Sequence, residues 1–173
     1  VLMLNKELEW VPAIDPVHFD RPKIPGVGIA RTFGRTLAAV NPSATIGLIP
    51  AAVGGTSLDE WKPGGKLYTD AVQRARAGMK AGKLRAILWH QGESDAHPGL
   101  SEHYAEKLRA LIARFRTDLN APDLPFIIGE LGQFPGKPWD ADVRRVDSVH
   151  RAIAATVPHV AYVMTDGGAL PAW

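Results

Sequence analysis

The chain has 173 residues, of which 46% are hydrophobic and 22% charged, and this balance is typical of one globular domain with a single core. It carries 20 Lys and Arg residues against 18 Asp and Glu residues and no run of basic side chains, which argues against nucleic acid as a partner. The absence of cysteine excludes disulfides and thiolate metal sites, and no apolar run is long enough to predict a membrane span.

Strand and helix patterns alternate along the chain. Residues 1–4 form an apolar, strand-like start, and residues 11–28 are rich in Pro and Gly and predict an extended surface loop. Apolar residues at helical spacing predict helices over 29–40, 67–81, 101–119 and 140–153, with Ser101 and Asp140 as N-caps of the last two. Short apolar runs predict strands at 45–50, 86–90, 125–129 and 160–164. This alternation predicts an α/β fold with a parallel sheet.

The two ends of the chain resemble cut ends of a longer sequence. The chain begins with Val1 in an apolar run, and it ends at Trp173 soon after the last predicted strand. We therefore expect further residues on both sides. A targeting segment could be among them, so the compartment stays open: secreted or periplasmic with such a segment, cytoplasmic without it.

A glycine-rich loop follows the predicted strand at 45–50. It reads Gly54-Gly55-Thr56-Ser57, and glycine lets backbone N–H groups converge on a ligand without a Cβ clash. Convergent N–H donors suit an anion or a developing oxyanion. The structural alternative is a plain tight turn between a strand and a helix.

A dense polar cluster follows the predicted strand at 86–90, where His90 is succeeded by Gln91-Gly92-Glu93-Ser94-Asp95. The Gln91 amide can donate to an oxyanion, and Glu93 can orient a histidine. Taken singly, His90 is more often a packed residue at a strand end, and Ser94 and Asp95 more often cap a loop. Five such residues at the end of a buried strand favour a functional site.

These two loops carry a family resemblance. The segments 54–61 and 89–95 resemble the second and third conserved blocks of the sialate O-acetylesterase and acetylxylan esterase branch of the SGNH hydrolases, carbohydrate esterase family six. The resemblance extends from residue 1 to about Met164. It implies a three-layer, flavodoxin-like parallel sheet with strand order 2-1-3-4-5. It also implies hydrolysis of acetyl esters on sugars, with an acetylated carbohydrate as substrate and with no metal or organic cofactor.

The same resemblance assigns roles to residues. The family attacks the ester with a serine in a Gly-Gln-Ser-Asn block and uses a histidine from a later Asp-x-x-His block. The oxyanion donors would be Gln91 and a backbone N–H near Gly55, and Glu93 would lie near the catalytic histidine. The expected substrate contacts are Gly54, Thr56, Ser57, Trp61 and His90.

The chain departs from the family pattern at the reacting residues. It contains no Gly-Gln-Ser-Asn block, and no Asp-x-x-His follows the last predicted strand. Asp15–His18 and Asp147–His150 spell Asp-x-x-His elsewhere, but such short matches arise easily by chance. Ser94 is a poor nucleophile, because a nucleophile elbow turns directly into a helix and His97-Pro98-Gly99 delays the helix here.

The family's first strand, which would lie between the strands at 45–50 and 86–90, is also absent from this chain. We therefore predict a partial SGNH-type domain over 1–173 that is inactive by itself. One alternative is a carbohydrate-binding pseudoenzyme that holds sugar on Trp61, Trp89 and the polar loops. A flavodoxin-like phosphate binder is a weaker alternative, because no phosphate-binding glycine motif is present. The sequence leaves the sugar, the acyl group and the oligomeric state open.

Overall fold

The structure, a computed structural model, describes residues 1–20, 26, 28–134 and 136–165. The chain divides into two compact units: one comprises Val1–Gly54 and Pro63–Leu84, and the other comprises Gly55–Lys62 and the chain from Arg85 onward. We refer to these as unit 1 and unit 2. The polypeptide passes from one unit to the other after residues 54, 62 and 84, so the units are interleaved along the sequence.

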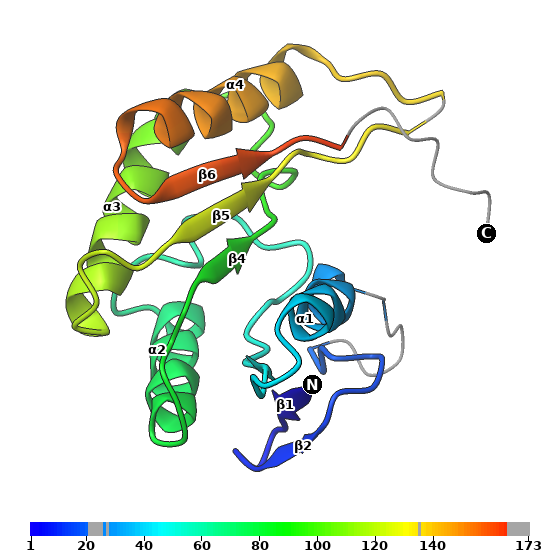
Figure 1. The fold of residues 1–173 in the computed structure, drawn as a ribbon. Coiled ribbons are helices and arrows are strands. Elements are labelled where there is room, and N and C mark those ends of the chain that lie inside the picture. The colour runs from blue at the N-terminus through cyan, green and yellow to red at the C-terminus, as the bar shows by residue number, and fades with distance from the viewer. Residues whose placement is uncertain (21–25, 27, 135, 166–173) are drawn as a thin grey trace. The chain divides into compact units, whose positions relative to one another are not determined.

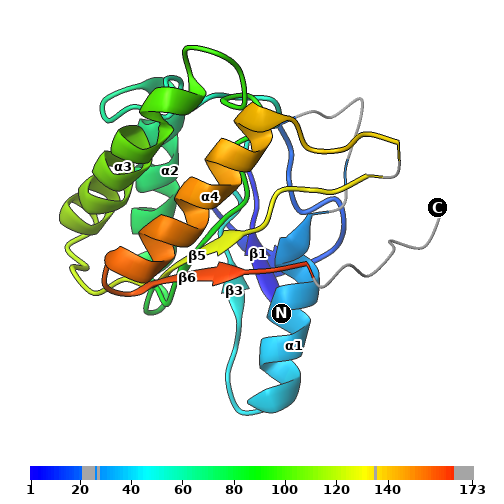
Figure 2. The same cartoon turned by 90° about the horizontal axis from the view of Figure 1, so that it is seen from above.

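Unit 1 contains a three-stranded mixed sheet and two helices. The sheet order is β2-β1-β3, where β1 (Leu2–Leu4) pairs antiparallel with β2 (Trp10–Pro12) and parallel with β3 (Gly47–Leu48). The helices are α1 (Ile29–Val40) and α2 (Lys66–Met79). All five elements are labelled in Figure 1 or Figure 2.

The core of unit 1 is small. Met3, Val17 and Leu48 are buried together, and partly buried apolar residues pack against them: Val11, Ala13, Ala30 and Ile46. Helix α2 packs closely on the end of β3, because a Cβ added at Gly78 would lie 2.5 Å from Cδ1 of Ile49. A glycine at this position therefore permits the close approach.

Unit 2 contains a parallel sheet with the order β4-β5-β6, formed by β4 (Ile87–Trp89), β5 (Phe126–Gly129) and β6 (Val160–Val163). A short 3₁₀ turn, Ser101–His103, leads into α3 (Tyr104–Asp118), and α4 (Ala141–Thr156) precedes β6. Helices α3 and α4 lie side by side over one face of the sheet (Figures 1 and 2). Each strand-to-strand connection thus passes through a helix, as a parallel sheet requires.

The core of unit 2 lies between this sheet and the two helices. Inward side chains of α3 and α4 recur three or four residues apart, and they meet alternate residues of β5. The largest side chains with less than 2% exposure here are Tyr104, Leu108, Leu111, Ile112, Phe126, Ile128, Leu131, Val146, His150 and Ile153.

The structure confirms the α/β fold with a parallel sheet. It also confirms Asp140 as an N-cap, since its side chain accepts a hydrogen bond from the Val143 N–H. Ser101 is not a cap: its hydroxyl bonds Asp142, and the helix begins later. The strand at 10–12 lies inside the predicted loop, of which residues 21–25 and 27 are outside the described residues.

Each sheet ends in a strand that pairs on one side. Among the described residues, β3 pairs only with β1 and β4 pairs only with β5. Each of these two strands is thus an edge strand of its own sheet. None of the helices in the described ranges is both long and apolar enough to cross a membrane.

Candidate functional site

Gln91 lies at the carboxyl end of β4 and joins two loops of unit 2. Its side-chain nitrogen donates to the carbonyl of Thr56 at 3.0 Å and to Oδ2 of Asp95 at 2.6 Å. The segment that begins at Gly55 therefore lies beside the polar loop that follows β4. Both hydrogens of the Gln91 amide have acceptors inside the unit, because an amide nitrogen carries two.

Asp95 is the buried anchor of these two loops, with a relative exposure of 0%. Its Oδ2 also accepts the backbone N–H of Leu58 at 2.9 Å, whereas Oδ1 has no hydrogen-bond partner among the described residues. Burial raises the pKa of the Asp95 carboxyl, although the hydrogen bonds from Gln91 and Leu58 act against this effect. The carboxylate thus links the loop at 55–62 to the loop at 90–95.

Tyr104 and His150 continue the hydrogen-bonded chain into the core. The Tyr104 hydroxyl lies 3.1 Å from Oε1 and 3.0 Å from the backbone oxygen of Gln91, and 2.8 Å from Nε2 of His150. Both rings are completely buried, and they meet edge to face at a centroid distance of 5.3 Å. Burial lowers the pKa of His150 to about 4, with the nearby Asp147 charge acting in the opposite direction.

The two glycines of the first loop have different environments. The Gly54 N–H donates to Oδ2 of Asp20 at 2.8 Å within unit 1, so that donor is occupied. Gly55 belongs to unit 2, is exposed, and has a φ of +75°, a backbone conformation that favours glycine. Of the two glycines, Gly55 is therefore the one whose N–H has no hydrogen-bond partner among the described residues.

The expected substrate contacts in this loop make internal contacts in the structure. The Thr56 hydroxyl accepts a hydrogen bond from the Trp61 indole N–H at 2.9 Å, and the Ser57 N–H donates to the Glu60 carboxylate at 2.8 Å. Trp61 is 5% exposed and packs edge-on against Trp89 at a centroid distance of 5.6 Å. Its ring is thus buried among the core side chains of unit 2.

His90 and Glu93 are exposed. Nε2 of His90 lies 3.1 Å from the backbone oxygen of Glu130, which holds the ring at the end of β4. The Glu93 carboxylate makes no hydrogen bond or ion pair with any described residue. The alternative that Glu93 caps the loop with its side chain is therefore wrong in this structure; only its backbone oxygen accepts a bond, from Ala96.

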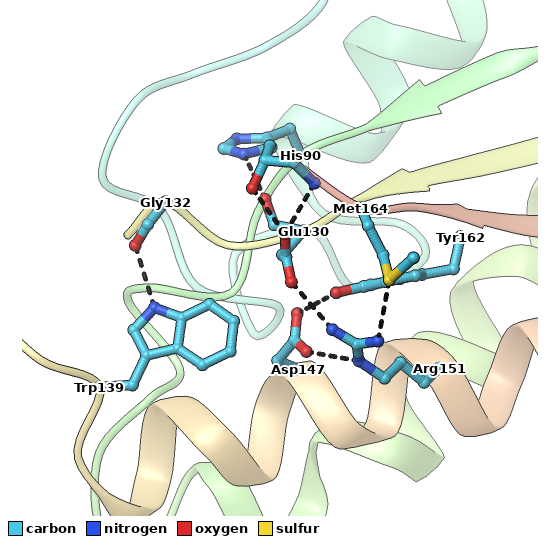
Figure 3. A network of polar contacts seen from close by, with 9 residues as sticks. His90, Glu130, Gly132, Trp139, Asp147, Arg151, Tyr162 and Met164 are labelled. Carbon is cyan, nitrogen blue, oxygen red and sulfur yellow. Dashed lines mark hydrogen bonds and ion pairs between the residues drawn. The ribbon is translucent and has the colours of Figure 1, made fainter. Parts of the chain in front are cut away.

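A second polar network lies at the carboxyl ends of β5 and β6 (Figure 3). Arg151 bridges two buried carboxylates, Glu130 at 2.8 Å and Asp147 at 3.0 Å, and the Tyr162 hydroxyl donates to Asp147. Glu130 also accepts the backbone N–H of Thr165 at 2.7 Å. Glu130 is not among the residues that the sequence assigns to the site; its place directly after the β5 strand is the signal that could have found it.

The two Asp-x-x-His matches have structural partners. Asp147 is held by Arg151 and Tyr162, and His150 by Tyr104, so neither is poised to act on a substrate. Asp15 pairs with Arg31 at 2.8 Å in unit 1. Ser94 lies in a turn that does not lead directly into a helix, as the sequence indicated. The described residues contain no cluster of three His, Asp or Glu side chains that could hold a metal ion.

Unit 1 contains a small, mostly apolar cavity of about 150 Å³. It lies at the carboxyl ends of β1 and β3 and includes none of the residues that the sequence assigned to the site. Arg74 closes it by donating to the carbonyls of Leu4, Asn5 and Pro50. The other lining residues include His18, Phe19, Asp20, Ala51, Ala52, Val53, Leu67, Asp70 and Ala71.

Known proteins match the chain over most of its length. A curated relative, the probable carbohydrate esterase At4g34215 of Arabidopsis thaliana, is 39% identical over 135 residues, which cover 73% of this chain and 51% of the relative. The X-ray structure of the Arabidopsis protein AT4G34215 matches with a TM-score of 0.86 and 34% identity, over 98% of this chain and 69% of that one. The chain thus spans about half the length of its curated relative.

A more distant structure shares the fold. XAC1771, a carbohydrate acetylesterase from Xanthomonas citri, matches with a TM-score of 0.63 at 18% identity, over 76% of this chain and 32% of that one. The family model described as carbohydrate esterase, sialic acid-specific acetylesterase matches residues 1–172. These matches confirm the resemblance carried by the two loops: the chain belongs to the sialic acid-specific acetylesterase family of carbohydrate esterases.

Proposed function

We propose that residues 1–173 are part of one SGNH-type domain that hydrolyses acetyl esters on carbohydrates. The observation that carries the proposal is the hydrogen bond from the Gln91 amide to Thr56, which joins the family's two loop blocks in one place. The serine nucleophile and the catalytic histidine would come from residues outside this sequence, because it contains no Gly-Gln-Ser-Asn block and no Asp-x-x-His after the last strand. Acetylated sugar is the substrate, and no cofactor is needed for acyl transfer to water.

Gly55 and Gln91 would supply donors to the oxyanion. Gly55 offers a backbone N–H in an exposed turn at a φ of +75°, a conformation in which a side chain would be strained. Gln91 can offer one amide hydrogen if it exchanges one of its two internal bonds. The bond to the Thr56 carbonyl is the one to exchange, because it is neutral and longer than the charge-assisted bond to Asp95.

Glu93 would orient the catalytic histidine. Its carboxylate is exposed and has no hydrogen-bond partner in the described residues, so it is available to a group that arrives from elsewhere. A carboxylate beside the histidine would stabilise the imidazolium that forms when the serine loses its proton. Glu93→Gln should therefore lower kcat and leave the melting temperature nearly unchanged.

The test compares the 173-residue chain with the product of the complete coding sequence. We expect the complete protein to release acetate from an acetylated sugar and to react with a fluorophosphonate serine probe, and the 173-residue chain to do neither. In the complete protein, Gln91→Ala should lower kcat by about 10²–10³ with little change in KM, as loss of one oxyanion donor does.

Two results would contradict the proposal. Stoichiometric labelling of Ser57 or Ser94 in the 173-residue chain would place the nucleophile within this sequence. A complete protein that binds acetylated sugar without releasing acetate would support the carbohydrate-binding pseudoenzyme instead.

A further inference from the structure

Only one assignment of donors and acceptors satisfies the buried hydrogen bonds around Gln91. The Gln91 nitrogen faces the Thr56 carbonyl and the Asp95 carboxylate, which accept, so the amide oxygen faces Tyr104. The Tyr104 hydroxyl has one hydrogen and lies near two oxygens of Gln91 that can only accept. Its hydrogen therefore goes to Gln91, and Nε2 of His150 must donate to the Tyr104 oxygen.

This assignment determines the protonation state and the tautomer of His150. The ring is neutral with its hydrogen on Nε2, and Nδ1 is a bare acceptor that has no partner among the described residues. Protonation would place a second N–H on Nδ1 where nothing accepts it, which is costly in a buried site. The lowered pKa of His150 agrees with this assignment.

We infer that Asp95 and Tyr104 are positioning residues, which together hold the Gln91 amide in one orientation and hold the Gly55–Leu58 backbone beside it. Asp95 binds both the nitrogen of Gln91 and the N–H of Leu58 through one oxygen, while Tyr104 binds the oxygen of Gln91 from the opposite side. If the amide turned by 180°, its oxygen would face the Thr56 carbonyl and the Asp95 carboxylate, which only accept, and its nitrogen would face the Tyr104 hydroxyl, which donates. Neither residue would touch the substrate; both would act through Gln91 and Gly55.

This inference deepens the proposed function, since it rests on Gln91 and Gly55 being the oxyanion donors. Its structural part is nevertheless measurable on the 173-residue chain without any catalysis. If the hydrogen bonds are not as described, the inference is overturned but the proposed function is not. A correct hydrogen-bond network in a protein without esterase activity would contradict the proposed function alone.

The first measurement uses the unaltered chain. Long-range ¹H–¹⁵N correlation of the His150 ring should show a neutral imidazole with the hydrogen on Nε2 at neutral pH. A hydrogen on Nδ1, or a charged ring, would overturn the inference, and no variant has to fold for this result to count.

The second measurement is amide hydrogen exchange at Leu58. Asp95→Ala should accelerate it about tenfold or more, because a hydrogen bond to a charged group is lost. Asp95→Asn should retain most of the protection, since one amide oxygen can accept from both Leu58 and Gln91. Asp59→Ala is the matched control: it removes a carboxylate of the same segment whose exposed ion pair with Lys107 does not involve the Leu58 N–H, so Leu58 exchange should not change. Equal exchange in Asp95→Ala and Asp59→Ala would overturn the role of Asp95.

The third measurement addresses catalysis in the complete protein. Tyr104→Phe keeps the ring and removes the hydroxyl, so we expect kcat to fall about tenfold with KM unchanged. Tyr68→Phe is the control, because it removes the hydroxyl of another buried tyrosine, one that belongs to unit 1, and kcat should not change. Unchanged kcat in Tyr104→Phe, or a change confined to KM, would overturn the role of Tyr104.

Discussion

The burial of His150 predicts that the chain loses stability in mild acid. The imidazole has a pKa of about 4 in the folded chain against 6.5 when exposed. Between these values the unfolded chain binds the proton more readily than the folded chain, so the free energy of unfolding decreases as the pH falls from 6.5 toward 4. The stabilisation is complete above pH 6.5.

The magnitude follows from the two pKa values. The full difference between the two pKa values corresponds to about 3 kcal/mol in the free energy of unfolding. About 2 kcal/mol of this is lost between about pH 7.5 and about pH 5. This is a large share of the stability of a small domain. Burial of the ring is the physical source of the loss, and among the described residues Nδ1 of His150 has no acceptor to offset it.

The assay is urea unfolding at about pH 7.5 and at about pH 5, followed by tryptophan fluorescence. His150→Gln keeps an N–H that can reach Tyr104 but does not titrate, so it should lose about 2 kcal/mol less than the wild type over this interval. His159→Gln, which removes an exposed imidazole from the same unit, should follow the wild type. Equal losses in the wild type and in His150→Gln would refute the reasoning. If His150→Gln does not fold, an NMR titration of the wild-type ring that shows protonation near pH 6 would refute it as well.

Two further predictions concern stability. Gly92 has a φ of +151°, and a Cβ there would lie 2.8 Å from Cγ1 of Val146, so Gly92→Ala should destabilise unit 2 by about 2–4 kcal/mol in urea unfolding. Gly99→Ala is its control, with a φ of +83° but open space around it, and should cost only about 1 kcal/mol; equal costs would show that crowding at Gly92 is unimportant. Asp140→Ala should cost about 1 kcal/mol by removing the cap of α4, and Asp140→Ser should restore most of it; a loss that Ser does not restore would contradict the capping role.

Much of the fold could be predicted because periodicity is a local signal. The stripes of α3 and α4 and the apolar runs of β5 and β6 depend only on neighbouring residues, and the structure contains all four elements near their expected bounds. β2 could not be predicted, because three residues that end in Pro12 carry no pattern distinct from a loop. Ser101 has the residue type of a cap, but a distant acceptor, Asp142, takes its hydroxyl instead.

The candidate site could be predicted only in part. The polar residues after β4 were visible, but their partners were not, since Gln91 bonds Thr56 and Asp95 while Tyr104 reaches it from 13 positions away. For Trp61, the family resemblance predicts a contact with the substrate. The sequence carries no signal that its indole would be buried against Trp89.

The three crossings of the chain between the units determine how the protein can be divided. A single cut after residue 54 leaves Pro63–Leu84 attached to the wrong half, and a single cut after residue 84 leaves Gly55–Lys62 behind. Neither unit can therefore be produced as one uninterrupted stretch of the gene. To produce unit 2 alone, the gene would have to join residues 55–62 to residue 85 through a linker. Any library that shuffles segments of this family should place its junctions in pairs, because exchanging one side of a crossing alone would separate Leu58 from Asp95.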